Sequence, residues 1–277
     1  MSSHQGSALQ RQLQFGYSPC PNDTFMFFGI ASGALTLPDC AVAVQLHDIE
    51  TLNRMALSEA LDISKLSIFA WLKVRDTYRL MHSGAALGYG CGPILIARRS
   101  LTHAELIRSR VVLPGEWTTA HLLFRLWAPE ADQRYFTAYH RIYDEIVSGR
   151  ADCGVIIHES RFTYEQHGFR GIIDLGQWWE EKTGLPVPLG CIAARAALGP
   201  DLLQAVDDLL RRSIETARQN PEAALPYIRR YAQEMDPDVL RSHIATFVNS
   251  FSLDLGARGL KALDTMEARA RALGVLS

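Results

Sequence analysis

Several features that define other protein classes are scarce or missing in this chain of 277 residues. Charge of one sign is not in excess, since 28 basic and 30 acidic residues give a formal net charge of -2. Proteins that hold nucleic acid or anionic membranes electrostatically carry an excess of positive charge, so we expect neither partner. The densest apolar stretch, around residues 25–31, is far shorter than the ~20 residues needed to span a bilayer, so we expect no transmembrane helix.

Cysteine is also scarce, and its positions are scattered. The chain has five cysteines, an odd number without any Cys-x-x-Cys pair: Cys20, Cys40, Cys91, Cys153 and Cys191. This spacing is typical of reduced thiols rather than of a disulfide framework or a zinc site. The segment 1–14 is polar and lacks the apolar core of a signal peptide. We therefore predict a cytoplasmic protein.

The common motifs of nucleotide-binding and hydrolytic enzymes are missing as well. No Gly-x-x-x-x-Gly-Lys-Ser/Thr loop occurs, and the glycines between 84 and 92 lack the Gly-x-Gly-x-x-Gly spacing. His158-Glu159 does not continue into a zinc-protease motif, because Phe162 stands four residues after His158. The Gly-x-Ser-x-Gly motif of α/β hydrolases is absent too. The function must therefore depend on other residues.

Short apolar runs alternate with amphipathic stretches along most of the chain. The pattern predicts strands at 13–17, 41–47, 62–68, 110–115, 134–139 and 152–158, and helices at 23–32, 48–58, 69–74, 118–128 and 141–149. Strands that alternate with helices of this length indicate an α/β protein with parallel strands. After residue 198 the pattern is helical, with breaks near Pro200, Pro221, Pro237 and Gly256.

Two similar segments bracket the middle of the chain. GPILIARRSL (92–101) and LGCIAARAAL (189–198) each combine a glycine, an apolar run and Ala-Arg. We interpret them as adjacent strands that cross between two α/β lobes, a larger discontinuous lobe (1–97 plus 194–277) and a smaller inserted lobe (98–193). This topology is typical of hinge-closing proteins whose ligand lies in the cleft. The same pattern also fits one continuous sheet in which the similarity is accidental.

Polar residues stand where predicted strands end and helices begin, positions at which helix N–H groups hold anionic ligands. The candidates are the segment SPCPNDTF (18–25), the run Lys65-Leu66-Ser67, the pair Thr118-Thr119, and His158. Their alternative role is structural, since Asn22 or Asp23, Ser67 and one of the threonines are all suited to cap the next helix. If His158 lies at the cleft mouth, its ordinary pKa near 6.5 suits proton abstraction. Glu159 and Arg161 either orient His158 or form a surface pair.

Six sequence segments, taken together and in this order, are specific enough to indicate a protein family. They are SPCPNDTF (18–25), DIETLN (48–53), SKLS (64–67), Thr118-Thr119, IIHESRFTY (156–164) and LGQWWEEKTGLPVPLG (175–190). In these segments the chain resembles the 1,4-dihydroxy-6-naphthoate synthase family of the futalosine route to menaquinone. The resemblance extends from about Gln14 to Asp254. It departs at Ser64, where threonine is expected, but the hydroxyl group is retained.

The resemblance implies a two-lobed periplasmic-binding-protein-like fold of type II, used as a cytosolic lyase without metal or organic cofactor. It implies conversion of cyclic dehypoxanthinyl futalosine, a small-molecule substrate, into 1,4-dihydroxy-6-naphthoate and a sugar-derived fragment. The role of catalytic base is implied for His158. Substrate binding is implied for Lys65, Leu66, Ser67, Thr118 and Thr119. The sequence makes no prediction of the oligomeric state.

Two alternatives stay open on the sequence alone. Chorismate dehydratase of the same pathway shares the fold, although a sequence other than His158-Glu159-Ser160 is expected there at the end of the strand. A non-catalytic solute-binding or ligand-sensing protein normally carries an export signal or a DNA-binding module, and the sequence shows neither. Turnover of each candidate substrate distinguishes the two enzymes, and binding without turnover indicates a receptor.

Overall fold

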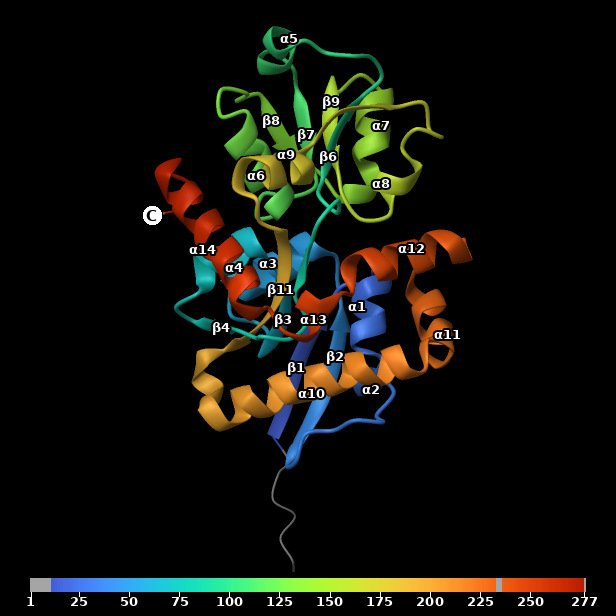
Figure 1. Cartoon of the computed structure of the whole chain (residues 1–277), viewed down its shortest axis with the longest axis vertical. Helices are drawn as coiled ribbons and strands as arrows, with labels where there is room; N and C mark the ends of the chain where they lie inside the picture. Colours follow the sequence, from blue (N-terminus) through green and yellow to red (C-terminus); the bar gives the residue numbers. More distant parts are fainter. Residues whose placement is uncertain (1–10, 233–235, 277) are drawn as a thin grey trace, which may run out of the picture.

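The computed structural model describes residues 11–232 and 236–276. Two β-sheets lie one above the other along the long axis of the molecule, and helices cover both (Figure 1). We call the first sheet with its helices the larger lobe and the second sheet with its helices the smaller lobe. This architecture confirms the predicted two-sheet α/β class. Within the described ranges, no helix combines the length and the apolar character needed to cross a membrane.

The larger lobe is built on the strand order β2-β1-β3-β11-β4, with β5 also paired to β11. Its strands are β1 (Arg11–Tyr17), β2 (Cys40–Leu46), β3 (Ile63–Ser67), β4 (Tyr78–Leu80), β5 (Ala86–Gly88) and β11 (Val187–Arg195). Strand β1 pairs in parallel with β2 and β3, whereas β11 runs antiparallel to β3. Its helices are α1 (Pro21–Met26), α2 (Phe28–Ala31), α3 (Ile49–Leu57), α4 (Ile68–Val74), α10 (Pro200–Gln219), α11 (Pro221–Tyr231), α12 (Pro237–Phe247), α13 (Ser250–Leu253) and α14 (Gly256–Ala272). A 3-10 turn spans Ala196–Leu198.

The smaller lobe is built on the strand order β10-β6-β9-β7-β8. Its strands are β6 (Ile94–Ala97), β7 (Val111–Leu113), β8 (Arg134–Phe136), β9 (Cys153–Ile156) and β10 (Arg170–Asp174). Strand β7 is parallel to β8 and β9, whereas β6 is antiparallel to β9 and β10. Its helices are α5 (His103–Ile107), α6 (Thr119–Trp127), α7 (Ile142–Val147), α8 (Ser160–Thr163) and α9 (Leu175–Thr183), and a 3-10 turn spans Tyr139–Arg141.

Local sequence signals set most helix starts as predicted. Asp48 caps α3, where its carboxylate accepts hydrogen bonds from two backbone N–H groups, and Thr118 caps α6 through the N–H of His121. The expected caps Asn22 and Asp23 are wrong, since α1 begins at Pro21 and both side chains lie within the helix. Proline favours the first helical position, which explains this earlier start. The predicted helix 23–32 is in fact divided into α1 and α2.

The chain crosses from the first sheet to the second between β5 and β6, and it returns between β10 and β11. Strand β6 pairs with β9 and β10, and β11 pairs with β3, β4 and β5, so the prediction that these two segments are adjacent strands is wrong. Residues 94–97, expected in the larger lobe, thus join the second sheet, and residues 187–193 join the first. An apolar run indicates a buried strand but not which sheet receives it. The boundaries of the lobes stay a prediction.

We call the residues between β5 and β6 (89–93) and those between β10 and β11 (175–186) the crossing segments. They contact each other through one glycine in each segment. A Cβ atom on Gly92 would lie 2.2 Å from Cα of Gly176, and one on Gly176 would lie 2.5 Å from Cα of Gly92. Beside this contact, the N–H of Leu175 donates to the carbonyl of Pro93 at 2.9 Å. Glycine is therefore required at both positions, because any side chain would separate the two backbones.

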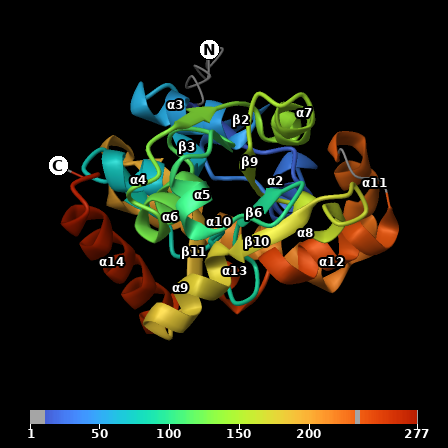
Figure 2. The ribbon, with the colours of Figure 1, turned by 90° about the horizontal axis from the view of Figure 1, so that it is seen from above.

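One apolar cluster extends through both lobes. It includes Leu66 of β3, Leu113 of β7, Leu123 of α6 and Met266 of α14. Figures 1 and 2 show α14 on one flank of the molecule and α11 and α12 on the opposite flank. The lobes are thus held together by shared core packing as well as by the two crossing segments.

Replacing Gly176 with alanine tests the contact between the crossing segments. We expect the free energy of unfolding to fall by about 1–3 kcal/mol in urea denaturation, because the added methyl group must push two backbones apart. The control is Gly259→Ala in α14, where the new Cβ would meet side-chain atoms of Leu255 and Leu87 at 3.2–3.5 Å and no backbone atom of another segment as close. The neighbours must yield by only a few tenths of an ångström and alanine favours helix there, so we expect a clearly smaller loss than for Gly176→Ala. Unchanged stability of Gly176→Ala would show that the contact is dispensable.

Candidate active site

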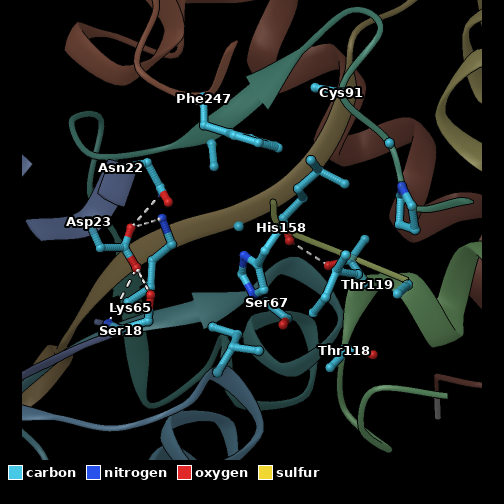
Figure 3. A pocket seen from close by; sticks show the side chains of 18 residues that line it. Ser18, Asn22, Asp23, Lys65, Ser67, Cys91, Thr118, Thr119, His158 and Phe247 are labelled. Carbon is cyan, nitrogen blue, oxygen red and sulfur yellow. Dashed lines mark hydrogen bonds and ion pairs between the residues drawn. The ribbon is translucent and has the colours of Figure 1, made fainter. Parts of the chain in front are cut away.

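A cavity of about 90 Å³ lies between the two lobes (Figure 3). Its polar lining residues are Ser18, Asn22, Asp23, Lys65, Ser67, Thr118, Thr119 and His158. Its apolar lining includes Ile49, Cys91, Pro93, Ile157, Leu189 and Phe247. The polar residues lie at or just beyond the carboxyl ends of β1, β3, β7 and β9, which is where ligands bind in open α/β sheets. The sequence candidates therefore meet in one place, although they come from both lobes.

A buried ion pair forms the floor of the larger-lobe side. The ammonium Nζ of Lys65 lies 2.9 Å from Oδ1 of Asp23, with side-chain exposures of only 5% and 2%. Asp23 also accepts hydrogen bonds from the hydroxyl of Ser18 at 2.6 Å and from the amide of Asn22 at 2.9 Å. The carboxylate is thus saturated, whereas an ammonium group has three N–H donors. Lys65 keeps donors for a bound molecule.

Ser67 presents a free hydroxyl donor to the cavity. It occupies the position before α4, but its side chain does not cap that helix, so the alternative role as a cap is wrong. Instead its Oγ accepts from Nδ2 of Asn53 at 3.1 Å, and its N–H donates to Oδ1 of Asn53 at 2.9 Å. Because the oxygen is used as an acceptor, its own hydrogen is left for a ligand.

The threonine pair marks the start of α6, and both hydroxyl groups are engaged. The Oγ1 of Thr118 donates to the carbonyl of Gly115 at 2.9 Å and accepts from the N–H of His121. The Oγ1 of Thr119 donates to the carbonyl of Leu189 at 2.6 Å, so the expectation that one threonine hydroxyl is free is wrong. The first N–H groups of a helix have no partner within it. The backbone of Thr119 and Ala120, rather than the hydroxyls, therefore offers donors here.

His158 follows β9 and has a backbone φ of 58°, which few residues other than glycine adopt. Such unfavourable backbone conformations occur preferentially at functional sites. Its Nδ1 lies 3.5 Å from Sγ of Cys20, and its ring contacts the ring of Tyr139 at 5.0 Å. Burial lowers the pKa of His158 below its ordinary value, and the carboxylates of Glu159 and Asp23 oppose this shift. The imidazole is therefore neutral near pH 7 and able to accept a proton.

Among the six residues for which catalysis or substrate binding is implied, Leu66 is the one that does not line the cavity. Successive side chains of a strand point to opposite faces, so Lys65 and Ser67 face the cavity while Leu66 lies in the apolar core. Arg161 does not form the surface pair with Glu159 that was one of its two expected roles. Its guanidinium group instead pairs with the carboxylate of Asp174 at 3.1 Å. Its role is to hold the chain near the crossing segment, where it also donates to the carbonyl of Gly92.

Three residues near the site were not identified from the sequence. Asn53 orients Ser67, Cys20 contacts His158, and His243 donates to Asn22 from α12. Asn53 and Cys20 lie within two of the segments that carry the family resemblance (48–53 and 18–25), and this position in the sequence is a signal that points to them. His243 lies in the helical C-terminal region, 221 residues from its partner, and no local pattern indicates it.

Two lobes with a cavity between them are the arrangement of periplasmic-binding-protein-like folds, and solved structures confirm this class. A crystal structure of a protein from Archaeoglobus fulgidus superposes with a TM-score of 0.89 at 29% identity, covering 97% of this chain and 100% of that one. The alkanesulfonate-binding protein from Xanthomonas axonopodis, bound to MOPS, superposes with a TM-score of 0.73 at 14% identity, covering 98% and 96%. At that identity the second likeness shows the fold alone.

The family is shown by sequence. The chain belongs to the menaquinone biosynthesis family, whose model matches residues 13–272. The 1,4-dihydroxy-6-naphthoate synthase of Thermus thermophilus is 46% identical over 263 residues, covering 95% of both chains. The enzyme of the same name from Streptomyces coelicolor is 41% identical over 269 residues, covering 95% of this chain and 94% of that one. The resemblance found in the sequence is thus confirmed over nearly the whole chain.

Replacing Asp23 with asparagine tests the buried ion pair. We expect the free energy of unfolding to fall by about 3–5 kcal/mol in urea, because the ammonium of Lys65 is left buried without a countercharge. Adding Lys65→Met to this variant removes the orphan charge and should restore part of the loss. Asp238→Asn, in an exposed pair with Arg241, is the control and should change stability by less than about 1 kcal/mol. Equal effects at the two sites would contradict the role of the buried pair.

Proposed function

We propose that this chain is a lyase that converts cyclic dehypoxanthinyl futalosine into 1,4-dihydroxy-6-naphthoate and a sugar-derived fragment, with His158 as the proton-abstracting base. The observation that carries this proposal is the cavity, where an imidazole, an ammonium group and a helix N-terminus face one space in a chain of the menaquinone biosynthesis family. The scattered reduced thiols support a cytoplasmic location as a further part of the proposal.

In the proposed reaction the base removes an acidic proton next to the ketone of the substrate. The electron pair left behind expels the attached sugar-derived ring, and the second ring of the product becomes aromatic, which drives the reaction. Because Nδ1 of His158 faces the sulfur of Cys20, Nε2 is the ring nitrogen left for the substrate. A neutral imidazole is able to accept the proton in this step.

The substrate is held by donors from both lobes. Lys65 and Ser67 supply an ammonium group and a hydroxyl from β3, and the start of α6 supplies the backbone N–H groups of Thr119 and Ala120. A carboxylate is well matched to such donors. Thr118 shapes this helix start as its cap, and Leu66 contributes through the strand register that turns its two neighbours toward the cavity. Closure of the lobes on the substrate would exclude water and fix the base against the reacting carbon.

The reaction itself is tested by product analysis. Purified protein is incubated with cyclic dehypoxanthinyl futalosine and, separately, with chorismate, and the products are identified by mass spectrometry. We expect 1,4-dihydroxy-6-naphthoate from the first incubation and no dehydration product from the second. Turnover of chorismate, or binding of both compounds without turnover, would overturn the proposed function.

Replacing His158 with asparagine should lower kcat by about 10²–10⁴-fold, since the general base is lost. Affinity for the substrate, measured by calorimetry, should be retained because the donors on Lys65, Ser67 and α6 are untouched. The control is His167→Asn, the same substitution at an exposed histidine of the smaller lobe, which should keep full activity. Near-native turnover by His158→Asn would move the base elsewhere, and the segment 18–23 is the next place to test.

The pH dependence of kcat follows from the same histidine. Only the neutral imidazole accepts a proton, so activity is lost as the pH falls through the pKa of His158. Because burial lowers that pKa from its ordinary 6.5, the acid limb of the profile should lie below pH 6.5. Circular dichroism over the same range should show that the fold persists. An acid limb above pH 6.5 would contradict the buried, neutral state of this base.

A further inference from the structure

A second histidine lies behind the cavity, on the larger lobe. His243 on α12 is completely buried, and its ring is nearly parallel to that of His158, with an angle of 22° and 6.4 Å between the ring centres. Its Nε2 lies 2.9 Å from Oδ1 of Asn22. His243 does not itself line the cavity, so any effect on a bound substrate must pass through its neighbours.

The chemistry of the partners fixes which atom carries each hydrogen. The amide Nδ2 of Asn22 lies 2.9 Å from Oδ1 of Asp23, and a carboxylate only accepts. The amide oxygen of Asn22 must then face His243, which requires the hydrogen of His243 to sit on Nε2. A single directed chain results, in which His243 donates to Asn22 and Asn22 donates to Asp23, the partner of Lys65.

His243 is suited to remain a neutral donor throughout the reaction. Burial, together with the positive charges of protonated His158 and of Lys65, lowers its pKa to about 3. Its other ring nitrogen, Nδ1, is buried and has no hydrogen-bond partner among the residues that the structure describes. Protonation would therefore place a second hydrogen where no acceptor receives it, which costs free energy.

We propose that His243 is a positioning residue, which holds the amide of Asn22 against Asp23 and thereby sets the direction of the Lys65 ammonium toward the substrate. This role rests on the proposed function, because it assigns Lys65 to substrate binding. The residue affects the binding donors on the larger lobe and not the base on the smaller lobe. Its loss should therefore be visible in KM, while the rate of the chemical step is largely kept.

The test compares three replacements of His243. His243→Gln keeps a neutral N–H donor near the position of Nε2, whereas His243→Leu has no donor and His243→Asn is too short to reach Asn22. We expect KM for cyclic dehypoxanthinyl futalosine to rise about tenfold in the leucine and asparagine variants, the loss of about one hydrogen bond. We expect kcat to change by less than about threefold, and we expect the glutamine variant to recover most of the wild-type KM.

A control separates positioning from general loss of packing. Leu240→Ala lies on the same helix and is buried in the apolar core. It should lower the melting temperature without changing KM. If His243→Leu does not fold, His243→Asn supplies the same comparison. An unchanged KM in a folded donor-free variant, or an equal rise of KM in Leu240→Ala, would overturn the proposal.

A second readout does not depend on the reaction. In nuclear magnetic resonance spectra of the ligand-free protein, the side-chain amide of Asn22 should exchange slowly with solvent in wild type and in His243→Gln, and faster in His243→Leu. Imidazole spectra should show His243 as the Nε2–H form from pH 5 to pH 8. Failure of wild type to turn over the substrate would refute the proposed function only. The amide exchange would then decide the role of His243, and equal exchange in all variants would overturn it.

Discussion

The buried ion pair between Asp23 and Lys65 is the interaction around which this site is organised. Removing two charges from water is costly, and their mutual attraction offsets the cost only when the remaining donors and acceptors are satisfied. Asp23 meets this condition through Ser18 and Asn22. Lys65 does not, because among the described residues Asp23 is its only counterion and leaves N–H donors of the ammonium group without an acceptor. The pair thus holds the ammonium group of Lys65 in a fixed position at the cavity, with some of its hydrogen-bond donors unused. In the proposed function, a carboxylate of the substrate accepts hydrogen bonds from these remaining donors.

The second constraint is that the proposed binding groups and the proposed base belong to different lobes. Lys65 is fixed by the first sheet and His158 by the second, so the relation between the two sheets sets the geometry of the reaction. Three features hold that relation: the backbone contact of Gly92 with Gly176, the apolar cluster shared by the lobes, and the hydrogen bond from the N–H of Trp117 to Glu50 of α3. Since the last of these lies near the start of α6, it couples α3 to the loop that precedes the helix N–H donors. Changes far from the cavity at these points would alter the alignment of base and substrate.

The sequence predicted much of what depends on local chemistry, although the caps expected at Asn22 or Asp23 and at Ser67 are wrong, and it missed what depends on distant pairing. Asp48 and Thr118 cap their helices as expected, because a cap is decided within three or four residues. The positions of Lys65, Ser67 and His158 at strand ends also follow from local pattern. Strand β6 belongs to the second sheet because it pairs with β9 and β10, which lie more than fifty residues away in the sequence. An apolar run predicts a buried strand but does not indicate which sheet the strand joins. For the same reason the sequence does not indicate His243, because its partner Asn22 lies near the other end of the chain.

The electrostatics around His158 explain how this buried imidazole, as the proposed base, could be used repeatedly. In the proposed reaction the imidazole becomes an imidazolium, and the groups around it act in opposite directions: burial and Lys65 disfavour the charged ring, while Glu159 and Asp23 favour it. Because burial is the largest of these effects, the balance lies with the neutral ring, so the proton taken from the substrate is readily given up again. The neighbouring ring of His243 does not compete for it, since burial keeps that imidazole neutral as well. The carboxylates then serve to limit the cost of the transient charge, and Lys65 remains the one permanent cation among the groups that line the described cavity.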